Sequence, residues 1–547
     1  MKKRPFAFAG GRGLFGGSLA VCCFVLLFGV KATASDSQTK AEAAEKQQTH
    51  RCWYAPKEAV QTWQQWRFGL FIHWGPVSLT GKEISWSRAG LRRGHRSRRG
   101  HGTPVEIYDN LYKRFNPVKF NADEWVRIAQ QAGMKYLVFT TKHHDGFCNF
   151  DSKLTDYKIT SKDSPYGKDI CRQLADACHR ANFPLGWYYS PPDWHHPDYR
   201  NGARHAQYIR YLHGQIKELL TNYGKVRILW FDGLGGKAED WDAERLFCMI
   251  RRLQPDILIN NRCGLPGDFD TPEQRIGRFS RERPWETCMT LGRQWAWKPN
   301  DQLKSLKQCL QILLRVVGGD GNFLFNVGPM PDGRIEPRQV QRLLEMGQWL
   351  RKYGEGVYGT RGGPFIPGNW GASTCKDNHI WLFVMNWPEK GPLMLPPVSQ
   401  KIVAVETLTA GRAEVKQTDE GIQVWLPQDQ RDEIASVIRL TTDGSAFEIP
   451  PVRVVPSGVV SAWGTAKASN VFHNMVKNFG PEKALDGDTN TRWATDAGTH
   501  AAWLEVDLKK PRTVGQVVIQ ECVRYGGPRI QKFRLTAKQN QQWKTIL

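Results

Sequence analysis

The stretch VRILWFDG at residues 226–233 is a short apolar run that stops at an aspartate followed by a glycine. Six more runs of this kind occur between residues 68 and 327: Phe68–Trp74, Tyr136–Lys142, Leu185–Ser190, Ile257–Arg262, Trp285–Thr290 and Phe323–Val327. Amphipathic helical patterns lie between them, at 123–134, 169–182, 203–222, 238–252 and 303–317. This alternation predicts βα units with a parallel sheet. We therefore expect an α/β fold that closes as a (β/α)8-like TIM barrel over residues 53–360, although only seven of its strands are recognisable in the sequence.

A different pattern follows the barrel. After the glycine-rich YGTRGGP, segments such as HIWLFVMNW and IQVWLP alternate without helical periodicity, which predicts a β-sandwich over residues 361–445. The proline-rich EIPPVRVVPSG predicts a linker at 446–460. A third block occupies residues 461–547.

Composition restricts the class of protein and its partners. The 547 residues include 40% hydrophobic and 24% charged residues, which excludes a disordered or fibrous chain. The net charge of +23 is compatible with nucleic acid or a polyanionic polysaccharide, but no zinc-finger, basic-heptad or RNA-binding pattern is present. The 22 tryptophans favour carbohydrate, because flat aromatic faces stack on sugar rings.

The first 34 residues combine a basic start, an apolar stretch and a small-residue site at Ala32-Thr33-Ala34. This pattern predicts a secretory signal peptide at 1–34 and a secreted or periplasmic protein without a stable membrane span after cleavage. An uncleaved membrane anchor is the alternative. The cysteines form no CxxC pair and no zinc spacing, and their pairing cannot be read from the sequence.

Polar and aromatic residues gather at the ends of the predicted strands. In a parallel barrel these carboxyl ends meet on one face, where functional residues lie. The rule selects His73, His143, His144, Tyr188, Trp230, Asp232 and Arg262. Asp232 is either a turn aspartate or a carboxylate in the barrel mouth, where it can act as a nucleophile or a base. A metal site built from His73, His143, His144 and Asp232 is a further alternative.

Six ordered motifs then identify a family resemblance. They are FGLFIHWG, KYLVFTTKHHDGF, LGWYYS, ILWFDG, TPEQ with WETCMT, and NFLFNVGPMPDGRIEP followed by GQWLRKYGEGVYGTR. Together they resemble the α-L-fucosidases of glycoside hydrolase family 29, whose barrel is followed by a β-sandwich. The third block, with ALDGDTNTRWAT, resembles a discoidin-like (coagulation-factor type C) carbohydrate-binding module, here truncated. Calcium near Asp486, Asp488 and Asn490 is expected there, with a plain turn as the alternative.

The resemblance implies an exported retaining exo-α-L-fucosidase that needs two carboxyl groups and no catalytic cofactor. It makes Asp232 the nucleophile and Glu273 the acid/base, with Glu286 as the second candidate or else a sugar-contacting or structural group. Glu282 lies in a basic context, which predicts a solvated side chain. It assigns substrate binding to His73, Trp86, His143, His144, Tyr188, Trp230 and Arg262. Many members carry a Glu-Trp pair after the first strand, whereas this chain has Ser85-Trp86, so that glutamate contact is absent or moved to Glu83. The expected partners are fucosylated glycans.

Two other functions are compatible with the sequence. A carbohydrate-binding or adhesion protein on an inactive barrel would keep the appended module but not turnover. A metal-dependent hydrolase would lose activity on chelation, whereas a glycosidase that works through two carboxylates would not.

The segment Ser87–Gly102 generates a testable prediction. It contains six arginines and two histidines without an acid and follows the first strand on the catalytic face. The alternative is a solvated loop. If its guanidinium groups bind sulfate or carboxylate, acidic or sulfated fucosides are processed better than neutral ones at low salt, and the preference fades as salt rises. Replacing Arg92, Arg93, Arg96, Arg98 and Arg99 by Gln should remove the preference and spare a neutral aryl fucoside. An equal salt response of both substrates would contradict it.

Overall fold

The computed structural model describes residues 52–89, 102–454, 461, 464–486, 491–509, 511–522, 529–539 and 542–547. The predicted signal peptide and the five arginines Arg92 to Arg99 of the basic segment lie outside the described residues. None of the helices in the described part of the chain has the length and apolar character that a membrane crossing requires.

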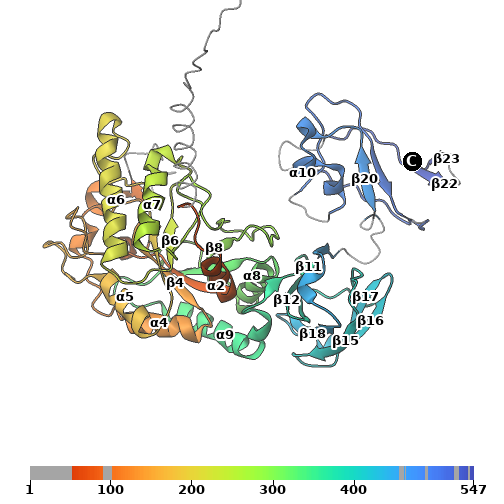
Figure 1. The fold of residues 1–547 in the computed structure, drawn as a ribbon, viewed down its shortest axis with the longest axis horizontal. Coiled ribbons are helices and arrows are strands. Elements are labelled where there is room, and N and C mark those ends of the chain that lie inside the picture. Colours follow the sequence, from red (N-terminus) through yellow and green to blue (C-terminus); the bar gives the residue numbers. More distant parts are fainter. Residues whose placement is uncertain are drawn as a thin grey trace, which may run out of the picture. The chain divides into compact units, whose positions relative to one another are not determined.

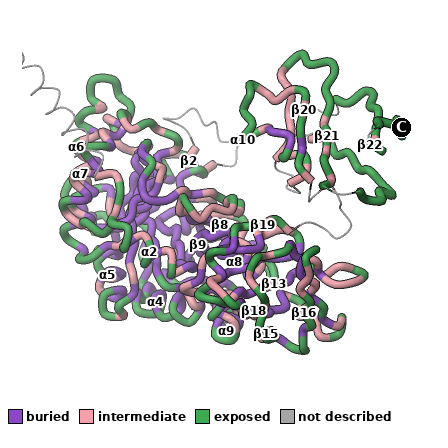
Figure 2. The backbone as a smooth tube through the Cα atoms, turned by 45° about the vertical axis from the view of Figure 1, so that its right-hand side comes forward, coloured by how far each residue is buried: buried purple, intermediate pink, exposed green. Residues whose placement is uncertain are grey.

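Seven parallel strands form the central sheet, as the seven apolar runs predict. They are β1 (Phe68–Ile72), β4 (Tyr136–Lys142), β5 (Leu185–Tyr189), β6 (Ile228–Phe231), β7 (Leu258–Ile259), β8 (Glu286–Thr290) and β9 (Asn322–Val327). The strand order is β7-β6-β5-β4-β1-β9-β8. Every residue in these strands is buried, which explains the apolar runs without alternation. Figure 2 shows this buried backbone at the centre of the part of the chain that contains the parallel sheet.

The two edge strands of this sheet are linked by an irregular segment. Residues 269–273 make isolated parallel bridges, pairing Phe269 with Asn260 after β7, and Asp270 and Glu273 with Trp285 and Cys288 of the β8 side. The parallel sheet is therefore curled, with seven regular strands and an extended segment where an eighth strand was expected. This segment carries Glu273.

Helices follow the strands and cover the outside of the sheet (Figure 1). They are α4 (Ala122–Gln131), α5 (Ile170–Arg180), α6 (His205–Thr221), α7 (Ala243–Leu253), α8 (Leu306–Gly318) and α9 (Pro337–Tyr353). Side chains cap three of them: Asn121 accepts from Glu124 N, Asp169 from Arg172 N, and Ser305 forms a capping box with Gln308. Their apolar faces, such as Ile170, Leu174 and Cys178 of α5, join the main core.

A further helix, α2 (Lys57–Trp66), closes the amino-terminal end of the sheet. Its Trp63 is fully buried, with its ring 4.6 Å from that of Phe269. Asn322 at the start of β9 donates a hydrogen bond of 2.8 Å to the Trp63 carbonyl. Short elements complete this region: η1 (Pro76–Thr80), β2 (Arg88–Ala89), β3 (Thr103–Pro104), α3 (Val105–Tyr108), η2 (Leu111–Lys113), η3 (Gly202–Arg204), η4 (Glu239–Trp241) and η5 (Gly354–Gly356).

Antiparallel sheets follow from residue 361. One contains β10 (Arg361–Gly362), β12 (Gly371–Lys376), β13 (His379–Val384), β18 (Ser436–Thr442) and β15 (Ile402–Thr407). A second contains β14 (Leu393–Leu395), β17 (Gly421–Trp425) and β16 (Glu414–Thr418). Leu382 and Leu440 of the first sheet and Leu395 and Val424 of the second belong to one buried cluster. Packing of two sheets through one core is the arrangement that the alternating sequence predicts.

The linker predicted at 446–460 is wrong in its first half. Residues 446–448 form η7, and β19 (Val452–Arg453) pairs in parallel with β11 (Phe365–Ile366). Ala446 and Ile449 are buried in the second core. The prolines led to the wrong prediction because a short edge strand tolerates them. The N–H that this pairing needs comes from Val452, which donates to the Pro364 carbonyl. Residues 455–460 lie outside the described residues.

The C-terminal block contains two antiparallel pairs. These are β20 (Thr465–Ala468) with β21 (Leu504–Asp507), and β22 (Thr536–Gln539) with β23 (Gln542–Thr545). The described residues of this block also form η9 (Phe472–Asn474), α10 (Val476–Phe479) and η10 (Pro481–Ala484). Of the predicted calcium ligands, Asp486 accepts a hydrogen bond of 2.7 Å from the Thr491 hydroxyl. Asp488 and Asn490 are outside the described residues, so the calcium site stays a prediction.

A disulfide and a buried cluster of ion pairs connect distant segments around the parallel sheet. A disulfide joins Cys52, ahead of α2, to Cys248 of α7, a pairing that the sequence could not predict. At the start of β9, the carboxylate of Asp320 is fully buried between Arg67, at 2.7 Å, and Arg361, at 2.6 Å. Gly362 also donates its N–H to Asp320 at 2.9 Å. Asp320 therefore connects the amino-terminal ends of β1 and β9 to β10, the first strand of the β-sandwich.

The buried contacts of Asp320 predict that part of the free energy of unfolding is lost in acid. Burial raises the pKa of Asp320, but the charge of Arg67 and the contacts of Arg361 outweigh it, so the pKa lies below its ordinary value. A lowered pKa means that the contribution is present above about pH 4 and is lost as the pH falls further. Asp320→Asn should destabilise the protein by about 3–5 kcal/mol at neutral pH, since Arg67 keeps an uncompensated buried charge.

Denaturant unfolding between pH 2 and pH 7 measures this effect, and the variant should lose less stability than the wild type on acidification. Asp123→Asn is the matched control, because its pair with Arg180 is exposed and should cost less than about 1 kcal/mol. Equal losses in the two variants would contradict the role given to Asp320.

Candidate active site

Asp232 directly follows β6 and lies at the carboxyl edge of the sheet. Its Oδ2 accepts a hydrogen bond of 3.0 Å from the Tyr188 hydroxyl and lies 3.5 Å from Nε2 of His144. Its Oδ1 lies 3.3 Å from Nη1 of Arg262. The next residue has to be glycine, since a Cβ on Gly233 would lie 2.2 Å from the Arg262 carbonyl. The ends of β5, β6 and β7 therefore converge on one carboxylate, which remains 15% exposed.

Arg262 is held rigidly beside this carboxylate. Its Nε donates to Thr271 Oγ1 at 2.8 Å, its Nη2 donates to the Thr271 carbonyl at 2.9 Å, and its guanidinium lies 4.7 Å from the Trp230 ring centre. Burial opposes its charge, but Asp232 and then Glu273 raise the pKa of Arg262 above its ordinary value. The side chain is a fixed cation.

Glu273 is brought to the same cation. Its Oε2 accepts a hydrogen bond of 2.8 Å from Nη1 of Arg262, the nitrogen that also faces Asp232. The side chain is 40% exposed. The structure thus places one shielded carboxylate and one solvent-accessible carboxylate on either side of a single guanidinium nitrogen.

His73 follows β1 and is neutral. Asn326 of β9 uses its amide nitrogen to bond the Trp295 carbonyl at 2.8 Å, so its Oδ1 accepts from Nδ1–H of His73 at 2.7 Å. The lone pair of His73 is consequently on Nε2. Burial lowers the pKa of His73 to about 4, with the Asn326 bond and the charge of Asp232 opposing the shift.

The two histidines after β4 both face the site, because the strand ends at Lys142 and the chain turns. Nδ1 of His143 lies 2.6 Å from Ser85 Oγ, and its ring stacks on Tyr188 at 5.3 Å. Nδ1 of His144 lies 2.6 Å from Ser190 Oγ, whose hydroxyl donates to the Pro192 carbonyl. Nδ1 of His144 is therefore the donor to Ser190, which turns Nε2 toward Asp232. Burial lowers the pKa of His143.

The segment after β1 adds an exposed aromatic side chain and distinguishes between the two alternatives for the missing glutamate contact. Trp86 is 41% exposed, and its ring lies 5.7 Å from that of His144 and 5.2 Å from that of Trp194. Glu83 does not replace the missing glutamate contact. Its carboxylate is directed at backbone N–H groups of Trp295 and Ala296 at 2.9–3.0 Å and so fixes the loop that contacts His73.

Glu286 lies behind the carboxylate pair and contacts Trp230 among the predicted site residues. It is the first residue of β8, at the amino end of the strand, and is 0% exposed. Its carboxylate accepts hydrogen bonds from the Tyr136 hydroxyl and from Nε1 of Trp230, the latter at 3.1 Å. Burial raises the pKa of Glu286 to about 7. Glu282 is exposed, as predicted for a solvated side chain.

Sequence reasoning missed the residues that orient the predicted ones. Asn326, Ser190, Trp295 and Tyr136 contact His73, His144 and Glu286 from distant positions in the chain; Asn326 and His73, for example, are 253 residues apart. A partner of this kind has no local signal. Only the strand-end rule could have suggested Asn326 and Ser190, which sit at the ends of β9 and β5.

A metal ion has limited support at this site. Ligand atoms of His143, His144 and Asp232 lie within 4.8 Å of one another, and within the described ranges no other group of three or more such residues is close enough. The guanidinium of Arg262 already lies 3.3 Å from Asp232, and this fixed positive charge repels a second cation.

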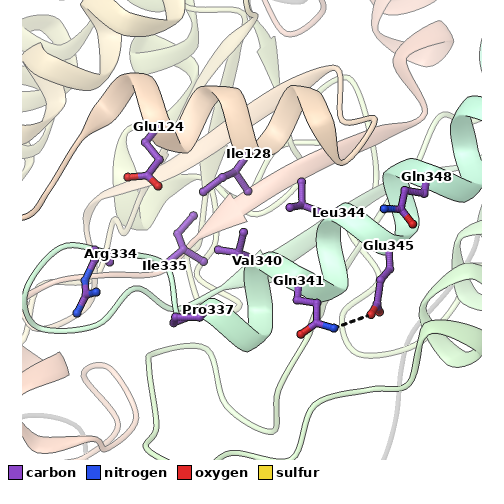
Figure 3. A pocket seen from close by; sticks show the side chains of 10 residues that line it. All are labelled: Glu124, Ile128, Arg334, Ile335, Pro337, Val340, Gln341, Leu344, Glu345 and Gln348. Carbon is purple, nitrogen blue, oxygen red and sulfur yellow. Dashed lines mark hydrogen bonds between the residues drawn. The ribbon is translucent and has the colours of Figure 1, made fainter.

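A separate hollow of about 630 Å³ lies on the outer side of the helices. Figure 3 shows it between α4 and α9, with Glu124 and Ile128 on one side and Val340 and Gln341 on the other. None of the strand-end residues lines it, so it is distinct from the candidate active site.

Comparisons with protein families match most of the described chain. The family model for alpha-L-fucosidase matches residues 34–355, and that for the F5/8 type C domain matches residues 465–547. The human tissue alpha-L-fucosidase is 27% identical over 396 residues, which cover 66% of this chain and 84% of that protein. The human plasma alpha-L-fucosidase is 28% identical over 399 residues, which cover 66% and 85%.

Solved structures show the same similarity. Alpha-L-fucosidase isoenzyme 1 from Paenibacillus thiaminolyticus is 35% identical with a TM-score of 0.64, over 71% of this chain and 99% of that one. A GH29 alpha-L-fucosidase from Bacteroides thetaiotaomicron, described as a trapped covalent intermediate, is 27% identical with a TM-score of 0.64, over 71% and 97%.

Proposed function

The chain belongs to the alpha-L-fucosidase family of glycoside hydrolases, and from this membership we propose that it is an exported, retaining exo-alpha-L-fucosidase. The observation that carries the proposal is the pair of carboxylates, Asp232 and Glu273, held by one nitrogen of Arg262. Asp232 serves as the nucleophile and Glu273 as the acid/base.

The spacing of these carboxylates supports the retaining mechanism. Contacts of 3.3 Å and 2.8 Å meet at Nη1 of Arg262, so the two oxygens lie no more than about 6.1 Å apart. Retaining glycosidases place their carboxyl groups about 5–5.5 Å apart, whereas inverting ones leave roughly 6.5–9.5 Å for a water molecule. The covalent intermediate named for the Bacteroides relative agrees with this choice.

In the proposed mechanism, Asp232 and Glu273 perform both chemical steps. Asp232 attacks the anomeric carbon and forms a glycosyl ester, while Glu273 gives its proton to the departing glycosidic oxygen. Glu273, now a carboxylate, takes a proton from water; the hydroxide oxygen attacks the anomeric carbon, and the Asp232 carboxylate leaves. Tyr188 and Arg262 stabilise Asp232 as the anion that both attacks and departs.

Sugar binding falls to the groups around Asp232. Neutral His73 offers a lone pair on Nε2 to a sugar hydroxyl, and His143 and His144 flank the same space. Trp230 and Tyr188 form a wall of stacked rings, 5.6 Å apart. Exposed Trp86 is placed to contact the leaving group.

Export and glycan partners complete the proposal. The Cys52–Cys248 disulfide supports an oxidising compartment, because such bonds are rare in the cytosol. The F5/8 type C domain supports binding to a fucosylated glycan, and calcium in that domain remains part of the proposal. Recognition of acidic or sulfated glycans depends on the basic segment and is tested by the arginine replacements described above.

Asp232→Ala tests the nucleophile. Hydrolysis of an aryl α-L-fucoside should fall by about 10⁴-fold or more, because the variant lacks the carboxylate that forms the glycosyl ester. Thermal unfolding should be little changed, because Arg262 keeps its hydrogen bonds to Thr271 and its ion pair with Glu273. Azide should restore part of the turnover and give a fucosyl azide of inverted configuration. Full activity of the variant would exclude the assignment.

Glu273→Ala tests the acid/base. Fucosides with a poor leaving group should be slowed about 10²–10⁴-fold, whereas a dinitrophenyl fucoside, which needs no protonation, should still form the glycosyl-enzyme. Azide should intercept that intermediate with retained configuration. Glu282→Ala, an exposed glutamate nine residues away, is the matched control and should behave as the wild type. A leaving-group dependence in Glu286→Ala instead of Glu273→Ala would reverse the assignment.

A further inference from the structure

Two of the three groups that contact Asp232, Tyr188 and Arg262, rest on Trp230. The indole ring of Trp230 is stacked on Tyr188, with the rings 5.6 Å apart and inclined by 17°. The guanidinium of Arg262 lies 4.7 Å from the centre of the Trp230 ring. Tyr188 and Arg262 in turn supply the contacts to the two oxygens of Asp232. The orientation of one ring is therefore coupled to both contacts.

Glu286 fixes the polar end of that ring. Its Oε1 accepts the Trp230 indole N–H at 3.1 Å, and its Oε2 accepts the Tyr136 hydroxyl. The three side chains come from β8, β6 and β4, so the carboxyl connects strands that are not neighbours in the sheet. Glu286 is 0% exposed.

A carboxyl group in this position is costly. No ion pair in the described part of the chain includes Glu286, and it lies inside an apolar cluster with Ile228, Phe71 and Leu324 around Trp230. Burying an acid without a cation is unfavourable, and an apolar side chain of similar volume would fill the space without this cost. Stability alone does not explain a glutamate here.

We propose that Glu286 is a positioning residue that holds the plane of Trp230 and, through it, the Tyr188 hydroxyl and the Arg262 guanidinium on Asp232; this role rests on the proposed function. Indole has a single polar hydrogen, so one acceptor is sufficient to select its orientation in the buried cluster. A displacement near 1 Å of groups that act on the nucleophile can cost about 10²-fold in rate.

The experiment compares three variants on an aryl α-L-fucoside. Glu286→Leu removes the acceptor, and kcat/KM should fall by about 10–100-fold, mainly in kcat. Glu286→Gln keeps an oxygen for the indole N–H and should retain kcat/KM within about fivefold. Tyr136→Phe is the matched control, because it removes a different hydrogen bond of Glu286 and leaves Trp230 bonded; it should also stay within about fivefold.

A double-mutant cycle tests the route through Trp230. Trp230→Phe keeps an aromatic ring but has no N–H, so Glu286→Leu should cost much less in that background than in the wild type. Full additivity of the two changes would overturn the proposal. So would equal losses in Glu286→Leu and Glu286→Gln, or azide rescue of Glu286→Leu, which would make Glu286 an acid/base.

Structural readouts separate this proposal from the proposed function. Crystal structures should show the Trp230 ring displaced in Glu286→Leu and unmoved in Glu286→Gln, whether or not the protein hydrolyses fucosides. An unmoved ring in both variants would exclude positioning. If Glu286→Leu does not fold, the isosteric Glu286→Gln still decides, since a loss above about 100-fold would show that the charge itself is needed. Absence of turnover by the wild type would contradict only the proposed function.

Discussion

Parallel pairing of the seven central strands is the constraint on which the site depends. In a parallel sheet all carboxyl ends lie along the same edge, so His73, His143, Asp232 and Arg262 meet although they are separated by up to 189 positions between His73 and Arg262. The register of β5 with β6, which sets Tyr188 beside Trp230, then decides the distance from the Tyr188 hydroxyl to Asp232. Catalytic geometry is a consequence of strand register.

Few groups at this edge of the sheet carry a positive charge. Arg262 is held at three nitrogens and serves both carboxylates, whereas burial keeps His73 and His143 with lowered pKa values. A neutral histidine can accept from or donate to sugar hydroxyls without competing with Arg262 for Asp232. The site thus combines one permanent cation with neutral hydrogen-bonding rings, which suits the proposed reaction, in which Asp232 forms and releases an ester.

Buried and half-buried polar groups align distant segments at several places in the described structure. Asp320 joins the barrel strands to the β-sandwich through Arg67 and Arg361, and Glu83 fixes the Trp295 loop by its backbone N–H groups. Glu286 belongs to the same class, since it connects three strands below the site. Such groups are directional, and apolar packing alone would leave the register of these segments less defined.

The sequence by itself determined the seven strands, the helices between them, the antiparallel region and the strand-end residues, because short-range hydrophobic periodicity reports burial along the chain. The two histidines after Lys142, Asp232 and Arg262 followed from that pattern. Tertiary structure alone decided the irregular segment that carries Glu273, the pairing of β19 with β11 beyond two prolines, the Cys52–Cys248 pair and the burial of Glu286. These features depend on contacts between residues far apart in the chain, for which local composition contains no signal.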